Sequence, residues 1–296
     1  MIRVFFEPFR YGFMQRALIE MVLLALATAL VGTLVVLRRL AFMSDAMSHT
    51  VFPGLAVAFA TGSSLLLGAI AAAAVSVVLL TIITRLPRLD DDAVLALLVA
   101  SFFGFGVIVV SRQHSFNADL TSLLFGRLLF VRTAQIIQTT VLLGLLVLVA
   151  FVVGKELFFR AFDPAGADAL GFSGPTLDLM ANAAIAIVVV AAAKAIGTAL
   201  VVTLLVTPAA TARLLTDRIT ALVLLTAAIA AIGAWIGLII SYDASVNHDV
   251  RLPAGATITI VWTLAFAAAR VVTFRRRRLR AATFETRELG RVHGTP

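Results

Sequence analysis

The amino-acid sequence predicts an all-α protein that crosses a membrane many times. Of the 296 residues, 61% are hydrophobic and only 14% are charged, and the mean hydropathy is +1.06. Soluble domains carry about a quarter charged residues. Several apolar runs also reach the roughly 20 residues that a helix needs to cross the hydrocarbon core of a bilayer. These observations predict a polytopic integral membrane protein and argue against a soluble enzyme.

Nine segments are apolar enough to be membrane helices. The segment 46–61 is the shortest, and it carries polar residues near its start. The segments 177–194 and 196–213 together are too long for one crossing, so we expect a tight reversal between them. The sequence therefore predicts eight or nine transmembrane helices, with nine preferred. In chain order the segments are 13–37, 46–61, 65–84, 92–111, 133–154, 177–194, 196–213, 219–241 and 254–274.

Basic residues indicate how the chain is oriented. Arg275–Arg278 and Arg280 directly follow the last apolar segment, as expected for a cytoplasmic flank, so we expect a cytoplasmic C-terminus. Most of the clustered excess of basic residues behind the net charge of +8 lies here, beside a membrane segment. The net charge therefore does not indicate a nucleic-acid partner. Nine crossings leave the N-terminus and its three arginines outside, against the positive-inside rule. We expect one transmembrane domain over 1–280 and a polar, disordered cytoplasmic tail over 281–296.

Two segments are predicted to lie outside the set of crossings. Residues 119–129 follow a polar loop and are too short to cross, which predicts a short or re-entrant helix. Residues 159–172 predict a helix at the cytoplasmic surface. There Asp163 is suited to be the N-cap and Pro164 the first helical residue, while Gly171 ends the helix.

Asp45 and His49 are the strongest candidates for a functional site. They are four residues apart, so on a helix they share a face and can hold one ion. A carboxylate and an imidazole suit Mn²⁺, Fe²⁺ or Zn²⁺, and the chain has no cysteine to provide a thiolate. The alternative is a hydrogen-bonded pair that fastens two helices. We expect Pro53 and Gly54 to interrupt this helix, and Pro208 to kink a second one, at membrane depth beside a transport pathway.

Several catalytic motifs are absent from the sequence. It contains no G-x-x-x-x-G-K-[ST] phosphate-binding loop, no H-E-x-x-H and no G-x-S-x-G. The chain itself is therefore predicted not to be an enzyme, and any pumping would draw its energy from another subunit or from an ion gradient. An ion-coupled secondary transporter and a non-transporting membrane scaffold remain as alternatives at this point. His114 and His248 fall in predicted outer loops, and Asp90–Asp92 opens a predicted helix.

Several motifs together resemble the membrane permeases of manganese, zinc and iron ABC importers. They follow the order found in that family and extend over roughly residues 13–274. Ser44 and Thr50 depart from the common pattern, where glycine and alanine are frequent. The resembling blocks are Leu37–His49 with Pro53–Gly54, Asp92–Ala93 with Ser101 and Gly104, Asp119–Leu120 with Leu124–Gly126, Asp163–Pro164 with Leu170–Gly171, Pro208–Arg213, and Leu252–Pro253 with Gly255.

The resemblance implies a specific assembly. Two copies of the permease would form a dimer in the bacterial plasma membrane, beneath an extracytoplasmic metal-binding protein and above two ATP-binding subunits. Asp45 and His49 match the metal-coordinating pair of the family. No cofactor is bound permanently, and the metal is cargo. The pattern S-H-x-x-x-P-G is similar to the manganese-type members, so manganese is favoured, with zinc or iron as alternatives. The residues matching the coupling helix that contacts the ATPase are Asp163, Pro164, Ala167, Leu170 and Gly171.

Overall fold

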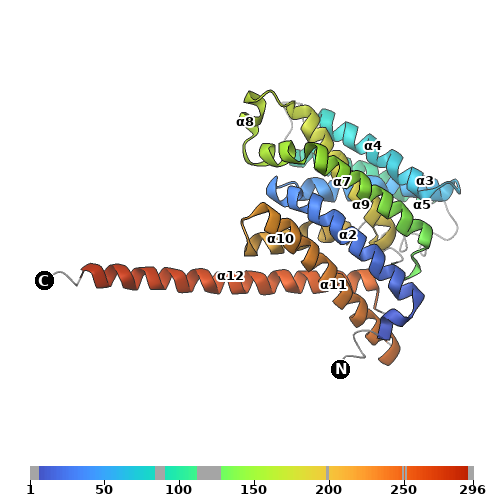
Figure 1. The fold of residues 1–296 in the computed structure, drawn as a ribbon. Helices are drawn as coiled ribbons and strands as arrows, with labels where there is room; N and C mark the ends of the chain where they lie inside the picture. The colour runs from blue at the N-terminus through green and yellow to red at the C-terminus, as the bar shows by residue number, and fades with distance from the viewer. Residues whose placement is uncertain are drawn as a thin grey trace.

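A computed structural model describes residues 7–83, 91–111, 128–197, 200–248, 250 and 252–292 of the chain. Within these ranges all regular secondary structure is helical, and the helices form a bundle with one long helix that extends well beyond it (Figure 1). This confirms the predicted all-α class.

The nine longer helices of the described part correspond to the nine predicted segments. Two 3-10 turns, Glu7–Arg10 (η1) and Leu128–Phe130 (η2), and the short helix Pro164–Ala169 (α8) lie between them. The helices are α2 Gly12–Leu37, α3 Ala41–Ala60, α4 Leu65–Ile83, α5 Asp91–Ser111, α7 Thr133–Phe162, α9 Gly174–Ile196, α10 Val201–Leu215, α11 Ile219–Asn247 and α12 Ala254–Val292.

Seven of these helices are long and apolar enough to cross a bilayer, and the two exceptions are α3 and α10. Helix α10 has only 15 residues. Helix α3 has 20 residues, but Asp45 and His49 lie within it. The candidate site therefore lies on one of the two long helices that do not meet this criterion.

One hydrophobic core draws buried residues from all nine long helices. Helix α2 lies in the middle of the bundle and packs against α7, α9, α10 and α11, whereas α3 packs chiefly against α4 and α5 (Figure 1). Buried polar contacts add specificity. The hydroxyl of Thr139 on α7 donates to the Glu20 carboxyl group on α2 at 2.7 Å, and the indole of Trp262 on α12 donates to the Ala230 carbonyl on α11 at 3.2 Å.

Close backbone contact fixes α3 against α4. A Cβ atom added at Gly54 would collide with the Gly68 carbonyl group, and one added at Gly68 would collide with the Gly54 carbonyl group. Small residues allow this approach, and they strengthen the packing of membrane helices because no hydrophobic effect drives helices together within lipid. The position of Asp45 and His49 therefore follows from a rigid α3–α4 pair.

The predicted interruption at Pro53 and Gly54 is wrong, because α3 continues through both residues. Helix α10 likewise continues through Pro208. A break would expose unpaired backbone groups to a medium without water, so a proline in a membrane helix is accommodated by local adjustment and packing. Both prolines are buried against neighbouring helices.

Several predicted boundaries also need correction. Residues 159–162 belong to the end of α7, so the surface helix is only Pro164–Ala169. Helix α11 extends to Asn247, into the predicted outer loop. Helix α12 continues to Val292 and so includes residues 281–292 of the predicted tail. This stretch is rich in Arg, Ala, Leu and Glu, which favour helices. Most of the predicted 119–129 helix lies outside the described residues, as do His114 and Asp90.

Candidate functional site

The structure places Asp45 and His49 together on α3, as predicted. The Nε2 atom of His49 lies 3.6 Å from the Oδ1 atom of Asp45. Protein hydrogen bonds with a nitrogen donor have typical donor–acceptor distances of 2.7–3.2 Å, so this separation is too long for one. The two groups are therefore near neighbours whose facing atoms remain available to a third partner.

The pair is accessible from outside the chain. The side chain of Asp45 is 45% exposed and that of His49 is 28% exposed. An intramembrane pair that serves only to fasten two helices of one chain would be buried between them. Here the carboxylate faces out of the bundle, so a fastening role within this chain does not account for its position.

Neighbouring residues orient the imidazole of His49 but form no hydrogen bond with it. The ring of Phe103 on α5 meets the His49 ring edge-on, with centroids 5.7 Å apart. The Nδ1 atom of His49 is buried and has no hydrogen-bond partner, which leaves Nε2 as the atom directed toward Asp45. Ser44 and Ser48 donate to carbonyl groups of their own helix, at 2.8 Å each, and so do not compete for the pair.

Pro53 adds a further feature to this turn. It stands four residues after His49 and has no N–H group, so the main-chain carbonyl of His49 lacks its usual i+4 donor. That oxygen belongs to the same residue as the imidazole. Carboxylate, imidazole and carbonyl groups are all ligands for hard or borderline divalent cations.

One chain provides too few side-chain ligands for a closed metal site. No group of three or more His, Cys, Asp or Glu side chains occurs within the part of the chain that the structure describes. An ion held by Asp45 and His49 would complete its shell with main-chain carbonyl oxygen, water or a second copy of the chain.

The surface helix has the end structure that the sequence predicts. The Asp163 carboxylate accepts a hydrogen bond from the Gly166 N–H group at 2.8 Å, and Pro164 occupies the first helical turn. Gly171 ends the segment in a left-handed conformation with φ of +83°. Ala167 is fully buried, whereas the side chain of Leu170 is 67% exposed. Helix α8 is thus anchored on one side and presents an apolar residue on the other.

Next to α8 lies an ion-pair network that the sequence analysis missed. Asp178, near the start of α9, is bound by the guanidinium groups of Arg38 and Arg160, and Arg160 also binds Asp168 on α8. The available signal was an acidic residue inside an apolar segment, which is costly and marks functional positions. Its partners come from 18 and 140 residues away, so spacing alone did not identify them.

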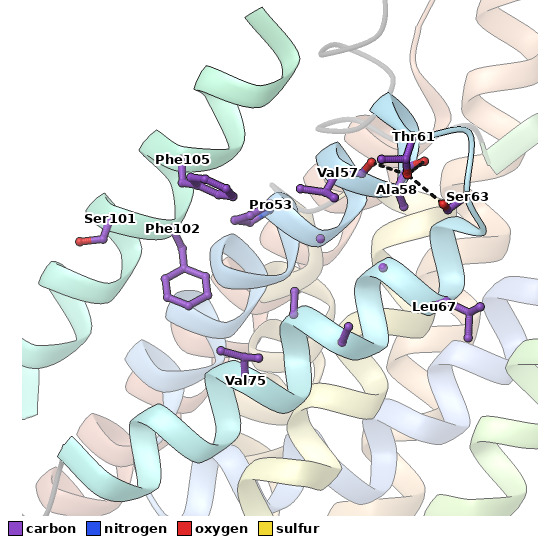
Figure 2. Close-up of a pocket in the computed structure, with 14 residues that line it drawn as sticks. Pro53, Val57, Ala58, Thr61, Ser63, Leu67, Val75, Ser101, Phe102 and Phe105 are labelled. Atoms are coloured by element: carbon purple, nitrogen blue, oxygen red, sulfur yellow. Dashed lines mark hydrogen bonds between the residues drawn. The ribbon is translucent and has the colours of Figure 1, made fainter. Parts of the chain in front are cut away.

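A large apolar groove lies beside the pair rather than around it. It has a volume of about 710 Å³ and is almost entirely apolar. Figure 2 shows that it runs from Pro53 on α3 between α4 and α5, with Phe102 and Phe105 on one wall and Thr61 and Ser63 at one end. Neither Asp45 nor His49 lines it. Its surface suits a hydrocarbon environment and includes no acidic or histidine side chain.

Comparison with known proteins places the whole bundle in one group. The family model described as the ABC 3 transport family matches residues 10–273. This chain belongs to the ABC 3 transport family. The chain is 32% identical over 257 residues to the manganese transport system membrane protein MntC of Listeria innocua, covering 87% of this chain and 89% of that protein.

Two further comparisons extend this result. The chain is 28% identical over 242 residues to the chelated iron transport system membrane protein YfeC of Yersinia pestis, covering 82% of each. Its fold is similar to a structure of PsaBC from Streptococcus pneumoniae in complex with Fab, with a TM-score of 0.79, 27% identity, and coverage of 91% of this chain and 95% of that one. The family match and the fold similarity therefore agree.

Proposed function

We propose that the chain is the transmembrane permease of an ABC importer that moves a divalent transition-metal cation into the cytoplasm. The observation that carries this proposal is the Asp45–His49 pair, which is accessible and not hydrogen-bonded internally, in a chain that matches the ABC 3 transport family over nearly its whole length. The pair lies on a helix that packs against the membrane-spanning helices α4, α5 and α9. This position supports transport, because ionisable residues among membrane segments are costly and mark ion pathways.

Manganese is the proposed cargo. The similarity to MntC supports it, and so does the site chemistry, because a carboxylate and one imidazole without thiolate do not exclude Mn²⁺. Nitrogen ligands alone would favour zinc, and the similarity to YfeC keeps iron as an alternative. The order that we propose is therefore manganese, then zinc, then iron.

The proposed assembly contains two copies of the chain. Two copies facing each other would supply two carboxylates and two imidazoles to one ion, which compensates for the small number of ligands in a single chain. Two ATP-binding subunits would contact α8 on the cytoplasmic side, where the basic residues at the end of α12 would also lie. An extracytoplasmic metal-binding protein would deliver the ion at the opposite side of the bacterial plasma membrane.

The mechanism follows from the desolvation of the ion. Removing water from a divalent cation is costly unless protein ligands replace it. Asp45 in its ionised form and His49 in its neutral form would provide these ligands inside the membrane. Hydrolysis of ATP by the partner would displace α8, alter the helix packing and open the site to the other side.

Uptake by proteoliposomes tests the proposal. We expect ATP-dependent Mn²⁺ uptake by the complex of permease and ATP-binding subunit in the presence of the metal-binding protein. Asp45→Asn and His49→Gln should each lower uptake by about tenfold or more, as expected for the loss of at least about 1.4 kcal/mol of ion binding. The matched control is His248→Gln, which alters an exposed Asp–His pair separated by 3.9 Å on α11 and its C-cap.

Two results would contradict this account in different ways. Uptake driven by a proton or sodium gradient without ATP would identify a secondary transporter instead. Full uptake by both Asp45→Asn and His49→Gln would remove the metal-site assignment while leaving the transport function in place.

A further inference from the structure

The ion-pair network at Asp178 joins four separate segments of the chain. The Nη2 and Nε atoms of Arg160, in the last turn of α7, lie 3.0 and 3.2 Å from the two carboxylate oxygens of Asp178 on α9. The Nη1 atom of Arg160 lies 2.9 Å from the Oδ1 atom of Asp168 on α8. Arg38, at the C-terminal end of α2, binds the Oδ1 atom of the same carboxylate. The network therefore links α8 to α2 through α7 and α9.

These contacts are built into the structure and are not loose surface pairs. The side chains of Arg38 and Arg160 are only 15% and 13% exposed. The Arg160–Asp178 contact is bidentate, a geometry that adds strength and directional precision. Gly174 makes room for it, because a Cβ atom at that position would lie 2.6 Å from the Nη2 atom of Arg160. A side chain at residue 174 would displace the guanidinium group.

The α2 end of the network is connected rigidly to the candidate metal site. Helix α2 ends at Leu37 and α3 begins at Ala41, so only three residues separate them. Two features fix this turn. Arg39 adopts a left-handed conformation with φ of +58°, and the Leu40 N–H group donates a hydrogen bond to the Val35 carbonyl at 2.8 Å. This is the Schellman pattern of a helix end, here without glycine. Asp45 follows in the second turn of α3.

We infer that Asp178 is a positioning residue that transmits displacement of α8 to the Asp45–His49 turn of α3. The inference rests on the proposed function, because α8 is the segment assigned there to the ATP-binding subunit. A displacement of α8 would reach Arg160 through Asp168. Asp178 binds both Arg160 and Arg38, so the displacement would pass to the end of α2. The short α2–α3 turn would then move Asp45. Neither Asp178 nor its partners contact the ion.

Coupling between ATP hydrolysis and uptake is the first test. In proteoliposomes containing the complete complex, Asp178→Asn should lower Mn²⁺ uptake per ATP hydrolysed by about tenfold, within the usual range of coupling between sites. ATP hydrolysis and Mn²⁺ affinity should stay within about twofold of wild type, and Asp178→Glu should restore part of the coupling. The matched control is Asp217→Asn, which removes an exposed Arg213–Asp217 pair at 2.7 Å outside the network.

Additional variants separate coupling from folding. Asp168→Asn breaks only the contact to α8, and this carboxylate is 61% exposed, so the fold should survive. It should lower coupling in the same direction as Asp178→Asn. The double variant Arg38→Gln with Asp178→Asn should lose no more coupling than the more affected single variant, because residues of one network are not additive. Wild-type coupling in both Asp178→Asn and Asp168→Asn would overturn the inference.

A distance measurement tests the link without any transport. The chain has no cysteine, so Phe42→Cys on α3 and Ala169→Cys on α8 create two unique sites for spin labels, both exposed. In the purified full-length permease, labelled chains are diluted with an excess of cysteine-free chains so that a dimer carries one labelled copy. Pulsed EPR should then give a narrow distance distribution that broadens in Asp178→Asn and stays narrow in Asp217→Asn. Equal distance distributions in the wild type, Asp178→Asn and Asp217→Asn would overturn the inferred coupling of α8 to α3. If the wild-type complex transports no metal, the proposed function fails. The distance measurement would still show whether Asp178 couples α8 to α3.

Discussion

At the scale of single residues, the arrangement around His49 combines three kinds of oxygen and nitrogen donor in one helical turn. Nε2 of His49 lies 3.6 Å from the Asp45 carboxylate, and Pro53 removes the N–H group that would normally pair with the His49 carbonyl. Phe103 holds the imidazole by an edge contact. Pro53 thus has a chemical consequence for the site although it does not break the helix.

Replacement of Pro53 tests this consequence. Pro53→Ala returns an N–H donor to the helix, so we expect an unchanged or higher melting temperature. We also expect Mn²⁺ affinity to fall by about tenfold, or about 1.4 kcal/mol, because the His49 carbonyl is then engaged in the helix. Calorimetric titration of the purified protein with Mn²⁺ measures the affinity.

Pro208→Ala is the matched control for that experiment. Pro208 is also a buried proline inside a continuous helix, but the carbonyl four residues earlier belongs to Leu204, a buried core residue. Affinity for Mn²⁺ should be unchanged in this variant. Equal effects of the two substitutions would indicate that proline acts on helix packing and not through the His49 carbonyl.

At the scale of elements, α8 is a short helix whose existence depends on its caps. Six residues are too few for a stable helix in isolation. The side chain of Asp163 satisfies the Gly166 N–H group at 2.8 Å, Pro164 presets the first turn, and Gly171 allows the left-handed exit. Burial of Ala167 then holds the helix against the bundle.

Removal of the N-cap should loosen α8 without unfolding the protein. Asp163→Ala should cost about 1 kcal/mol of local helix stability. Amide hydrogens of residues 166–170 should therefore exchange about fivefold faster, measured by hydrogen–deuterium exchange and mass spectrometry. Exchange in α9 should not change. Unaltered exchange in α8 would show that packing, and not the cap, determines this helix.

Local signals of this kind explain what sequence reasoning predicted well. Asp163, Pro164 and Gly171 act through their immediate neighbours, and the apolar segments reflect the bilayer length requirement, so all nine long helices were predicted within a few residues at most ends. The i, i+4 spacing of Asp45 and His49 also defines their shared face directly.

Non-local contacts explain what was missed. Helix α3 stays continuous through Pro53 because α4 and α5 pack around it, and the Gly54–Gly68 contact depends on two different helices. The Asp178 network joins residues up to 140 positions apart.

At the scale of the whole molecule, each chain offers an incomplete site on an accessible face. The described part of the chain contains no third acidic, histidine or cysteine ligand next to Asp45 and His49. An ion at this pair would therefore be shared between two copies of the chain. A site made by two chains would also explain why the pair is 45% and 28% exposed in one chain alone.

The stoichiometry of Mn²⁺ binding tests this central claim most directly. The purified dimeric permease should bind one Mn²⁺ per two chains, measured by Mn²⁺ EPR with parallel native mass spectrometry, and this binding should disappear in Asp45→Asn but persist in His248→Gln. A stoichiometry of one Mn²⁺ per chain, or undiminished binding in Asp45→Asn, would contradict the account.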